Sequence, residues 1–111
     1  MSPLLRATAI GTALQVAMVV AGHFVPALRD PGFAIGGMGL SALAGWLSAR
    51  PAGLAATLGG GAIAGGVCAA LGIGVSVLLG DVPPSLLMLG TAASTVTGII
   101  GAGLAHWRRP R

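Results

Sequence analysis

Four long apolar runs, each closed by proline or by charged residues, divide the chain. They cover residues 7–28, 32–49, 52–80 and 85–107. Inside each run the apolar residues follow one another continuously, without the alternation of apolar and polar positions that marks a half-buried strand. A helix needs about 20 apolar residues to cross roughly 30 Å of hydrocarbon. The pattern therefore predicts four transmembrane helices and favours them over the strands of a β-barrel.

The breaks between the runs have physical causes. Proline lacks the N–H that would continue a helix, and a charged side chain is costly in hydrocarbon. The third run, residues 52–80, is 29 residues long. Because this exceeds an upright span, we expect it to tilt or to begin with an interfacial turn before Gly59. The first run is longer than the core of a secretory signal, about 7–15 residues, so we expect a retained helix.

Composition points to the same class of protein. Of 111 residues, 55% are hydrophobic and 7% are charged, whereas soluble domains carry about 25% charged residues. We expect an all-α integral membrane protein, in which residues 1–111 form a single transmembrane domain, a four-helix bundle of two helical hairpins. The lone Cys68 excludes an intrachain disulfide.

The arginines predict the orientation of the helices. With the N-terminus inside, five of the six arginines lie on the inner side, and Arg29 lies alone outside: the five are Arg6, Arg50, Arg108, Arg109 and Arg111. This excess in short loops predicts that both termini are cytoplasmic, and we expect a bacterial inner membrane. The arginines close apolar runs and have no base-stacking aromatic residues beside them, so nucleic acid is not an expected partner.

Small residues recur at every fourth position and predict where helices pack. Such stripes let two backbones approach closely. The packing residues that we expect are Gly37, Ser41 and Gly45 in the second run, Gly61 and Gly65 in the third, and Gly90, Ser94, Gly98 and Ala102 in the fourth. So many small faces in a short bundle favour an oligomer or a larger membrane complex.

The first run carries a polar face that we expect to point into the bundle. Thr12, Gln15 and His23 fall within one sector of a helix. Pro26 is expected to cause a kink or an opened turn near His23. His23 is the ionisable residue set well inside a run, which makes it a candidate for proton, metal or substrate contact. The alternative is a neutral imidazole bonded to a helix carbonyl or to a loop residue near the outer surface.

A soft-metal site is a weaker hypothesis. His23, Met38 and Met88 are expected at a similar depth, and imidazole with thioethers would suit Cu(I). However, methionine also fills gaps in apolar packing, and no two of these residues share a helical turn. We therefore predict no metal site and no cofactor. No catalytic spacing of nucleophile and base occurs, so an enzyme is not expected.

Two functions remain open. The first is a structural or accessory subunit that packs with itself or with other membrane subunits in the lipid bilayer. The second is a small oligomeric transporter or channel, for a soft metal ion among other solutes, in which Thr12, Gln15 and His23 line the path.

The topology is testable with reporters. Because arginine-rich loops stay inside, a reporter enzyme fused after Arg111 is expected to show cytoplasmic activity. A cysteine placed at Ala52 is expected to resist a membrane-impermeant thiol reagent added from outside. Periplasmic reporter activity, or outside labelling at residue 52, would contradict the predicted orientation.

Overall fold

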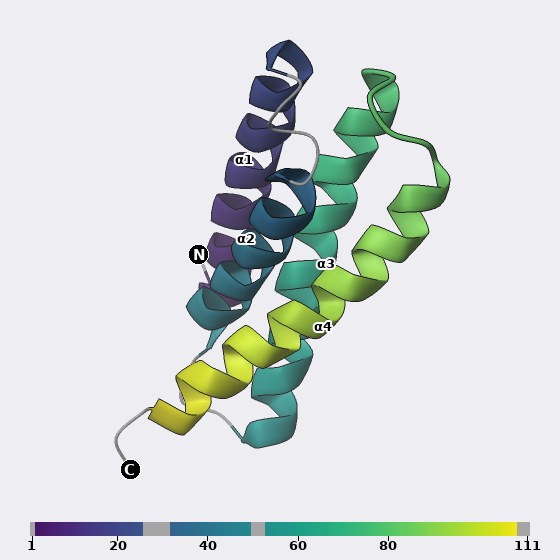
Figure 1. Cartoon of the computed structure of the whole chain (residues 1–111). Coiled ribbons are helices and arrows are strands. Elements are labelled where there is room, and N and C mark those ends of the chain that lie inside the picture. The colour runs from purple at the N-terminus through teal and green to yellow at the C-terminus, as the bar shows by residue number, and fades with distance from the viewer. Residues whose placement is uncertain (1, 26–31, 50–52, 109–111) are drawn as a thin grey trace.

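The computed structural model describes residues 2–25, 32–49 and 53–108, and these residues form four helices and no strand (Figure 1). The helices are α1 (Pro3–Phe24), α2 (Gly32–Ser48), α3 (Leu54–Leu78) and α4 (Ser85–Arg108). The bundle measures 45 × 23 × 20 Å. Its long dimension is close to the thickness of a bilayer with its headgroups, about 40–45 Å.

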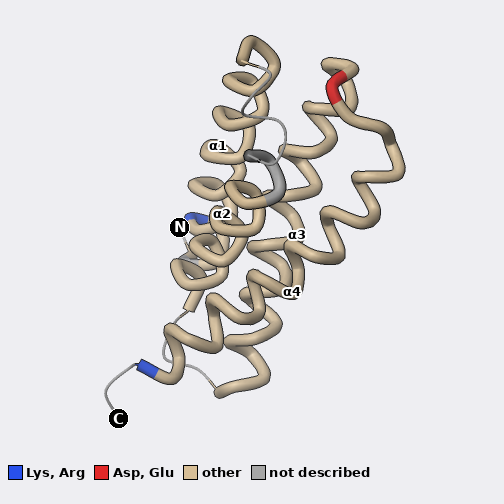
Figure 2. Tube along the Cα trace, viewed as in Figure 1, with Lys and Arg blue, Asp and Glu red and all other residues tan. Residues whose placement is uncertain are grey.

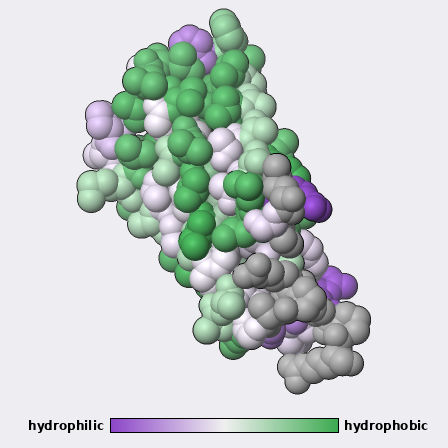
Figure 3. All heavy atoms as spheres, turned by 180° about the vertical axis from the view of Figure 1, so that it is seen from behind, coloured by the Kyte–Doolittle hydropathy of each residue, from purple (hydrophilic) through white to green (hydrophobic). Residues whose placement is uncertain are grey.

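Within the described residues, α1, α3 and α4 are each long and apolar enough to cross a membrane. The 17 residues of α2 would rise about 25 Å, which is short of roughly 30 Å of hydrocarbon. Large apolar side chains cover the outside of the bundle, as one face shows in Figure 3. Ile35, Leu78 and Met88 are each more than two thirds exposed. Such a surface is consistent with a membrane protein and would be poorly solvated in water.

Both ends of α1 differ from the sequence prediction. The helix begins at Pro3 instead of residue 7, because the hydroxyl of Ser2 accepts a hydrogen bond from the Leu5 amide at 3.1 Å and caps the first turn. It ends at Phe24, and Val25 is extended with φ −123° and ψ 94°. A residue before proline is pushed out of the helical region. The helix therefore ends one residue after His23, and Pro26, where a kink or an opened turn is expected, lies outside the described residues.

The third helix is shorter than its apolar run. It spans Leu54–Leu78 and is continuous through Gly59. At its end Gly80 adopts φ +78°, a conformation that glycine tolerates best. The amide of Gly80 donates to Val77 O and that of Asp81 to Ser76 O, each at 3.0 Å. This pair of bonds is a Schellman motif, and it fixes the direction in which the chain leaves α3.

The four helices pack around a central pair. α2 and α3 contact each other and both contact α1 and α4, whereas α1 and α4 share no backbone contact within the described residues. We call the half of the bundle that holds the α3–α4 connection the loop half, and the other the terminal half. Figure 2 shows the acidic residue of the described chain, Asp81, at that connection and the basic residues toward the ends of the chain.

Glycines bring α4 against α2 and α3 in the terminal half. A Cβ atom on Gly98 would collide with the Gly61 carbonyl oxygen and would lie 2.9 Å from the Gly65 Cα. One on Gly45 would lie 2.9 Å from the Gly98 Cα, and one on Gly101 would meet the backbone of Ala42. Ser94 and Ala102, one turn to either side of Gly98, are buried. The backbones therefore touch where a side chain would separate them.

The other stripe residues lie nearer the loop half. A Cβ on Gly90 would meet the Ile73 side chain at 2.5 Å, and one on Gly37 would lie 3.6 Å from Gln15 Oε1. Ser41 is fully buried between α1 and α3. In contrast, a Cβ on Gly39, Gly59 or Gly74 would meet nothing within 4 Å. Only some of the glycines are therefore explained by contacts within the described chain.

This contrast gives a matched pair of substitutions. Gly98→Ala is expected to lower the stability of the fold by about 1–3 kcal/mol, because the added methyl group overlaps backbone atoms. Gly74→Ala makes the same chemical change in open space and is expected to raise stability by about 0.4–1 kcal/mol. Unfolding by SDS titration in detergent micelles, followed by circular dichroism, measures both. Equal effects of the two changes would contradict the close approach at Gly98.

Candidate functional site

Gln15 connects three helices through hydrogen bonds. Its side chain is 2% exposed, and its Nε2 donates to the Gly37 carbonyl of α2 at 3.0 Å and to Ser41 Oγ at 3.1 Å. Ser41 Oγ in turn donates to the Gly65 carbonyl of α3 at 3.4 Å. Cys68 Sγ lies 3.9 Å from both Gln15 Nε2 and Ser41 Oγ. A polar cluster therefore ties α1, α2 and α3 together midway along the bundle.

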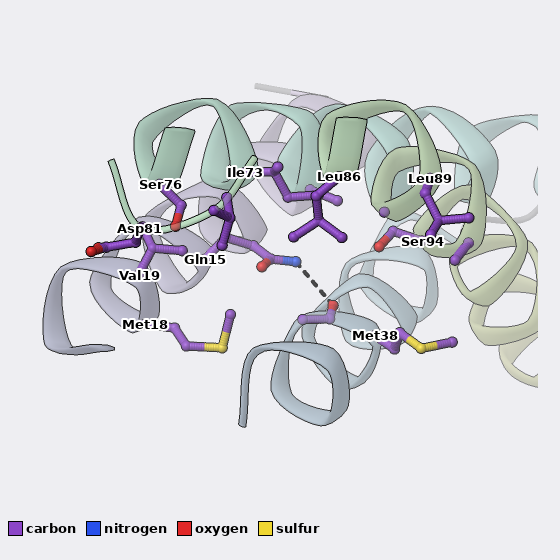
Figure 4. A pocket seen from close by; sticks show the side chains of 15 residues that line it. Gln15, Met18, Val19, Met38, Ile73, Ser76, Asp81, Leu86, Leu89 and Ser94 are labelled. Atoms are coloured by element: carbon purple, nitrogen blue, oxygen red, sulfur yellow. Dashed lines mark hydrogen bonds between the residues drawn. The ribbon is translucent and has the colours of Figure 1, made fainter. Parts of the chain in front are cut away.

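The partners of Gln15 fix the orientation of its amide. A backbone carbonyl only accepts, so the atom facing Gly37 O must be the NH₂ group. Its two N–H donors are engaged by Gly37 and Ser41. The amide oxygen takes part in neither bond, and Gln15 lines a cavity (Figure 4). Gln15 therefore presents an acceptor to that cavity.

His23 and Asp81 form a hydrogen-bonded pair between α1 and the α3–α4 connection. His23 Nδ1 lies 2.9 Å from Asp81 Oδ2 and 3.2 Å from Oδ1. The Asp81 side chain is 7% exposed and that of His23 is 36% exposed. Because a carboxylate only accepts, Nδ1 carries the proton in this bond. Phe24 packs edge-on against the imidazole, with ring centroids 5.2 Å apart.

The cavity fills the loop half, where α1 and α4 share no backbone contact. Its volume is about 470 Å³, and it extends from Gln15 and Ser94 to Asp81. Figure 4 shows side chains of all four helices around it. Apolar residues form most of the wall, namely Met18, Val19, Met38, Ala69, Ile73, Val82, Leu86, Leu89 and Ala93. This volume is typical of sites for small molecules, about 300–1,000 Å³.

Ser76 adds a polar group whose hydrogen-bonding capacity is unused. It is 1% exposed and lines the cavity, and its hydroxyl has no hydrogen-bond partner within the described part of the chain. Most buried hydroxyls are bonded, so such a group needs an explanation. Its backbone carbonyl accepts the Asp81 amide, so Ser76 lies beside the acid. Ser76 and Asp81 therefore both supply polar groups to the lining of the cavity.

The terminal half is closed. Ala44, Ala64 and Cys68 are fully buried against one another, and a Cβ on Gly11 would lie 2.9 Å from the Ala44 Cβ. On the side of these residues away from the cavity lies a second hollow of about 270 Å³, lined in part by Ser48 and Thr57. The Thr57 hydroxyl is buried and has no hydrogen-bond partner among the residues described. A layer of small residues therefore separates two hollows.

The structure distributes the sequence candidates over different environments. Gln15 reaches the cavity, His23 pairs with a residue at its edge, and the Thr12 hydroxyl is buried without a partner within residues 2–25, 32–49 and 53–108. Met38 lines the cavity, whereas Met88 is 81% exposed on the surface. Together with His23 these methionines occupy three separate settings. Within the described chain no three His, Cys, Asp or Glu side chains gather as metal ligands.

Sequence reasoning missed Asp81, Ser76 and Met18 as parts of the site. Asp81 lies between the third and fourth apolar runs, and the sequence alone did not join it to His23. The sequence did contain a signal. The chain has two acidic residues, and a histidine and an acid expected on the same side of the membrane can pair with each other. Ser76 and Met18 carried no signal, because serine and methionine are common inside apolar helices.

Comparisons with protein-family models, with curated proteins and with solved structures found no match. The chemistry of the cavity and its edge is therefore the basis on which a function is proposed.

The bond between His23 and Asp81 leads to a test on His23. Asn places an amide N–H where Nδ1 stands, so His23→Asn is expected to keep the bond to Asp81 and to fold nearly normally. His23→Leu removes a donor from a nearly buried carboxylate and is expected to cost on the order of 1–3 kcal/mol. SDS titration in micelles measures both. If His23→Leu were as stable as His23→Asn, the pair would not fasten α1 to the α3–α4 connection.

Proposed function

We propose that the protein is a small membrane carrier that receives small organic molecules in the loop-half cavity. The observation behind this is the cavity of about 470 Å³, which has mostly apolar walls and a few polar lining groups, Gln15, Ser76, Asp81 and Ser94. Sites for small molecules combine a mostly apolar lining with a few placed polar groups. Because Gln15 of the predicted polar face reaches this space, the cavity favours transport over a purely structural role.

In this proposal all four helices cross a bacterial inner membrane, with both termini in the cytoplasm. The excess of arginine on one side supports this orientation. The loop half, with Asp81, then faces outward, and the cavity receives its solute from the outer side. The short α2 spans by local thinning of the bilayer or by anchoring at its ends.

A carrier fits better than an open channel. Backbone contacts of Gly98 with Gly61 and Gly65 close the terminal half, so no continuous path leads through this conformation of the described chain. Passage requires the cavity to close and the hollow beside Thr57 to open. The residues between the cavity and this hollow have small side chains, so the helices can slide or tilt against each other there.

The second candidate is an accessory subunit in an oligomer or a larger complex. The observation that favours it is the set Gly39, Gly59 and Gly74, where a Cβ would meet open space. Glycine inside a helix costs roughly 0.5–1 kcal/mol relative to alanine. Close approach by a second copy or another membrane subunit would explain why glycine stands there.

Uptake into proteoliposomes separates the two candidates. We suggest three labelled solutes with a common phenyl body, namely benzyltrimethylammonium, phenylacetate and phenylalanine. A carrier is expected to take up at least one several times faster than empty liposomes do. Ala93→Leu, which fills the cavity wall, should abolish the gain, whereas Ala92→Leu on the exposed side of α4 should preserve it.

Uptake no faster than in empty liposomes for all three solutes, or uptake unaffected by Ala93→Leu, would contradict the carrier. A stable oligomer in crosslinking experiments, together with absent uptake, would favour the accessory subunit.

A further inference from the structure

We infer that the loop-half cavity selects solutes that carry an O–H or N–H donor beside an acceptor on an apolar body, as alcohols and primary amides do. The donor bonds to the side-chain oxygen of Gln15, and the acceptor bonds to the hydroxyl of Ser76. This inference rests on the proposed function and adds the class of solute to it.

The side-chain oxygen of Gln15 lies beside two glycines. A Cβ atom on Gly37 of α2 or on Gly72 of α3 would lie 3.6 Å from Gln15 Oε1. Both N–H groups of the Gln15 amide are engaged, one by the Gly37 carbonyl and one by Ser41 Oγ. Gln15 and Gly37 both line the cavity. Because neither glycine places a side chain against Gln15 Oε1, a donor on a solute can approach this oxygen.

Ser76 places a second polar group on the same face of α3. It follows Gly72 by four residues, a spacing that sets side chains about 5–6 Å apart on one face of a helix. Ser76 is 1% exposed and lines the cavity, and its hydroxyl has no hydrogen-bond partner among the described residues. In Figure 4 its oxygen points from α3 toward α1, the helix that carries Gln15. A buried hydroxyl is normally bonded, so Ser76 marks a position for a group that the solute brings.

The two protein groups define what the solute must offer. An amide oxygen only accepts, whereas a serine hydroxyl both donates and accepts. A primary amide can donate an N–H to Gln15 Oε1 and accept the Ser76 O–H with its carbonyl, and an alcohol can do both with one hydroxyl. A ketone or an ether has no donor, so it would cover Gln15 Oε1 without satisfying it, which is costly.

The rest of the lining offers little to a polar group. Asp81 lines the cavity too, but its carboxylate is engaged by His23, so the selection does not depend on it. Ser94 adds one hydroxyl from α4. The other side chains of the lining are apolar and give dispersion contacts to the body of the solute.

Calorimetric titration of the full-length protein in detergent tests the donor with two uncharged ligands of equal shape, 3-phenylpropanamide and 4-phenylbutan-2-one. They differ in one group, NH₂ in the amide and CH₃ in the ketone. The amide is expected to bind about tenfold more tightly or better, because the ketone leaves Gln15 Oε1 without a donor. Of the three solutes named for the uptake experiment, phenylalanine carries N–H donors and is the one expected to be taken up.

Ser76→Ala tests the hydroxyl. It is expected to lower the affinity for 3-phenylpropanamide about threefold, the effect of one lost hydrogen bond. The stability of the ligand-free protein to SDS should not fall, because no bond within the described residues is lost. Thr91→Val is the matched control, since its hydroxyl is also buried and without a partner in the described chain but lies outside the lining. It should leave the affinity unchanged.

Gly37→Ala tests the approach to Gln15. The added methyl group would lie 3.6 Å from Gln15 Oε1 and 3.8 Å from Met18 Cε, both ordinary contacts, so the fold should tolerate it. The methyl group takes the space through which a donor reaches the oxygen, and the amide affinity should fall roughly threefold or more. Gly39→Ala, on the same helix with nothing within 4 Å, should keep the affinity.

The outcomes separate this inference from the carrier. Equal affinity for the ketone and the amide, or unchanged amide affinity in both Ser76→Ala and Gly37→Ala, would overturn the donor selection while Ala93→Leu still abolished binding. Water would then satisfy Gln15 and Ser76. Uptake of benzyltrimethylammonium or phenylacetate without uptake of phenylalanine would also overturn the selection and keep the carrier. If neither ligand binds, or if binding survives Ala93→Leu, the proposed carrier site fails as well.

Discussion

The backbone of α4 at Gly98 lies directly against Gly61, Gly65 and Gly45, and the rest of the bundle follows from this approach. Between membrane helices the hydrophobic force is absent, so contact depends on dispersion and on how near the backbones come. α4 therefore packs most closely against α2 and α3 in the terminal half. Toward the loop half it has no such contact with α1. The closed terminal half and the open loop half therefore both follow from the way α4 crosses α2 and α3.

The polar groups lie where the close backbone packing ends. Gln15 joins α1 to α2 and α3 at the boundary between the closed half and the cavity. Beyond it, the pair of His23 with Asp81 holds the end of α1 to the α3–α4 connection. In an apolar surrounding these bonds have few competitors, so they fix the helices where side-chain packing is sparse. Gln15 and Asp81 also line the cavity, so these bonds hold the helices together at its wall.

Local sequence patterns predicted much of the secondary structure. Continuous apolar runs closed by proline and charge predicted four helices, and the structure has four helices close to those positions. The end of α1 at Phe24 was missed because the apolar run continues to residue 28, although the residue before a proline leaves the helix. The partner of His23 was missed because Asp81 is aimed by the turn at Gly80, and such three-dimensional placement is not encoded in hydropathy. The cavity depends on a crossing geometry that no single run specifies.

The loop half is expected to hold water-accessible space, whereas the terminal half is closed. Thiol reactivity in lipid tests it most directly, because maleimides and methanethiosulfonates react with the thiolate, which forms only where water reaches. In a Cys68→Ala background, Ala93→Cys in the cavity wall is expected to react readily, and Ala102→Cys in the buried terminal half is expected to stay inert. Ala92→Cys, exposed on the same turn as Ala93, reports reactivity at the lipid-facing side. Fast labelling at residue 93 alone is the predicted result, and labelling at 93 as slow as at 102 would show a dry interior and contradict the account.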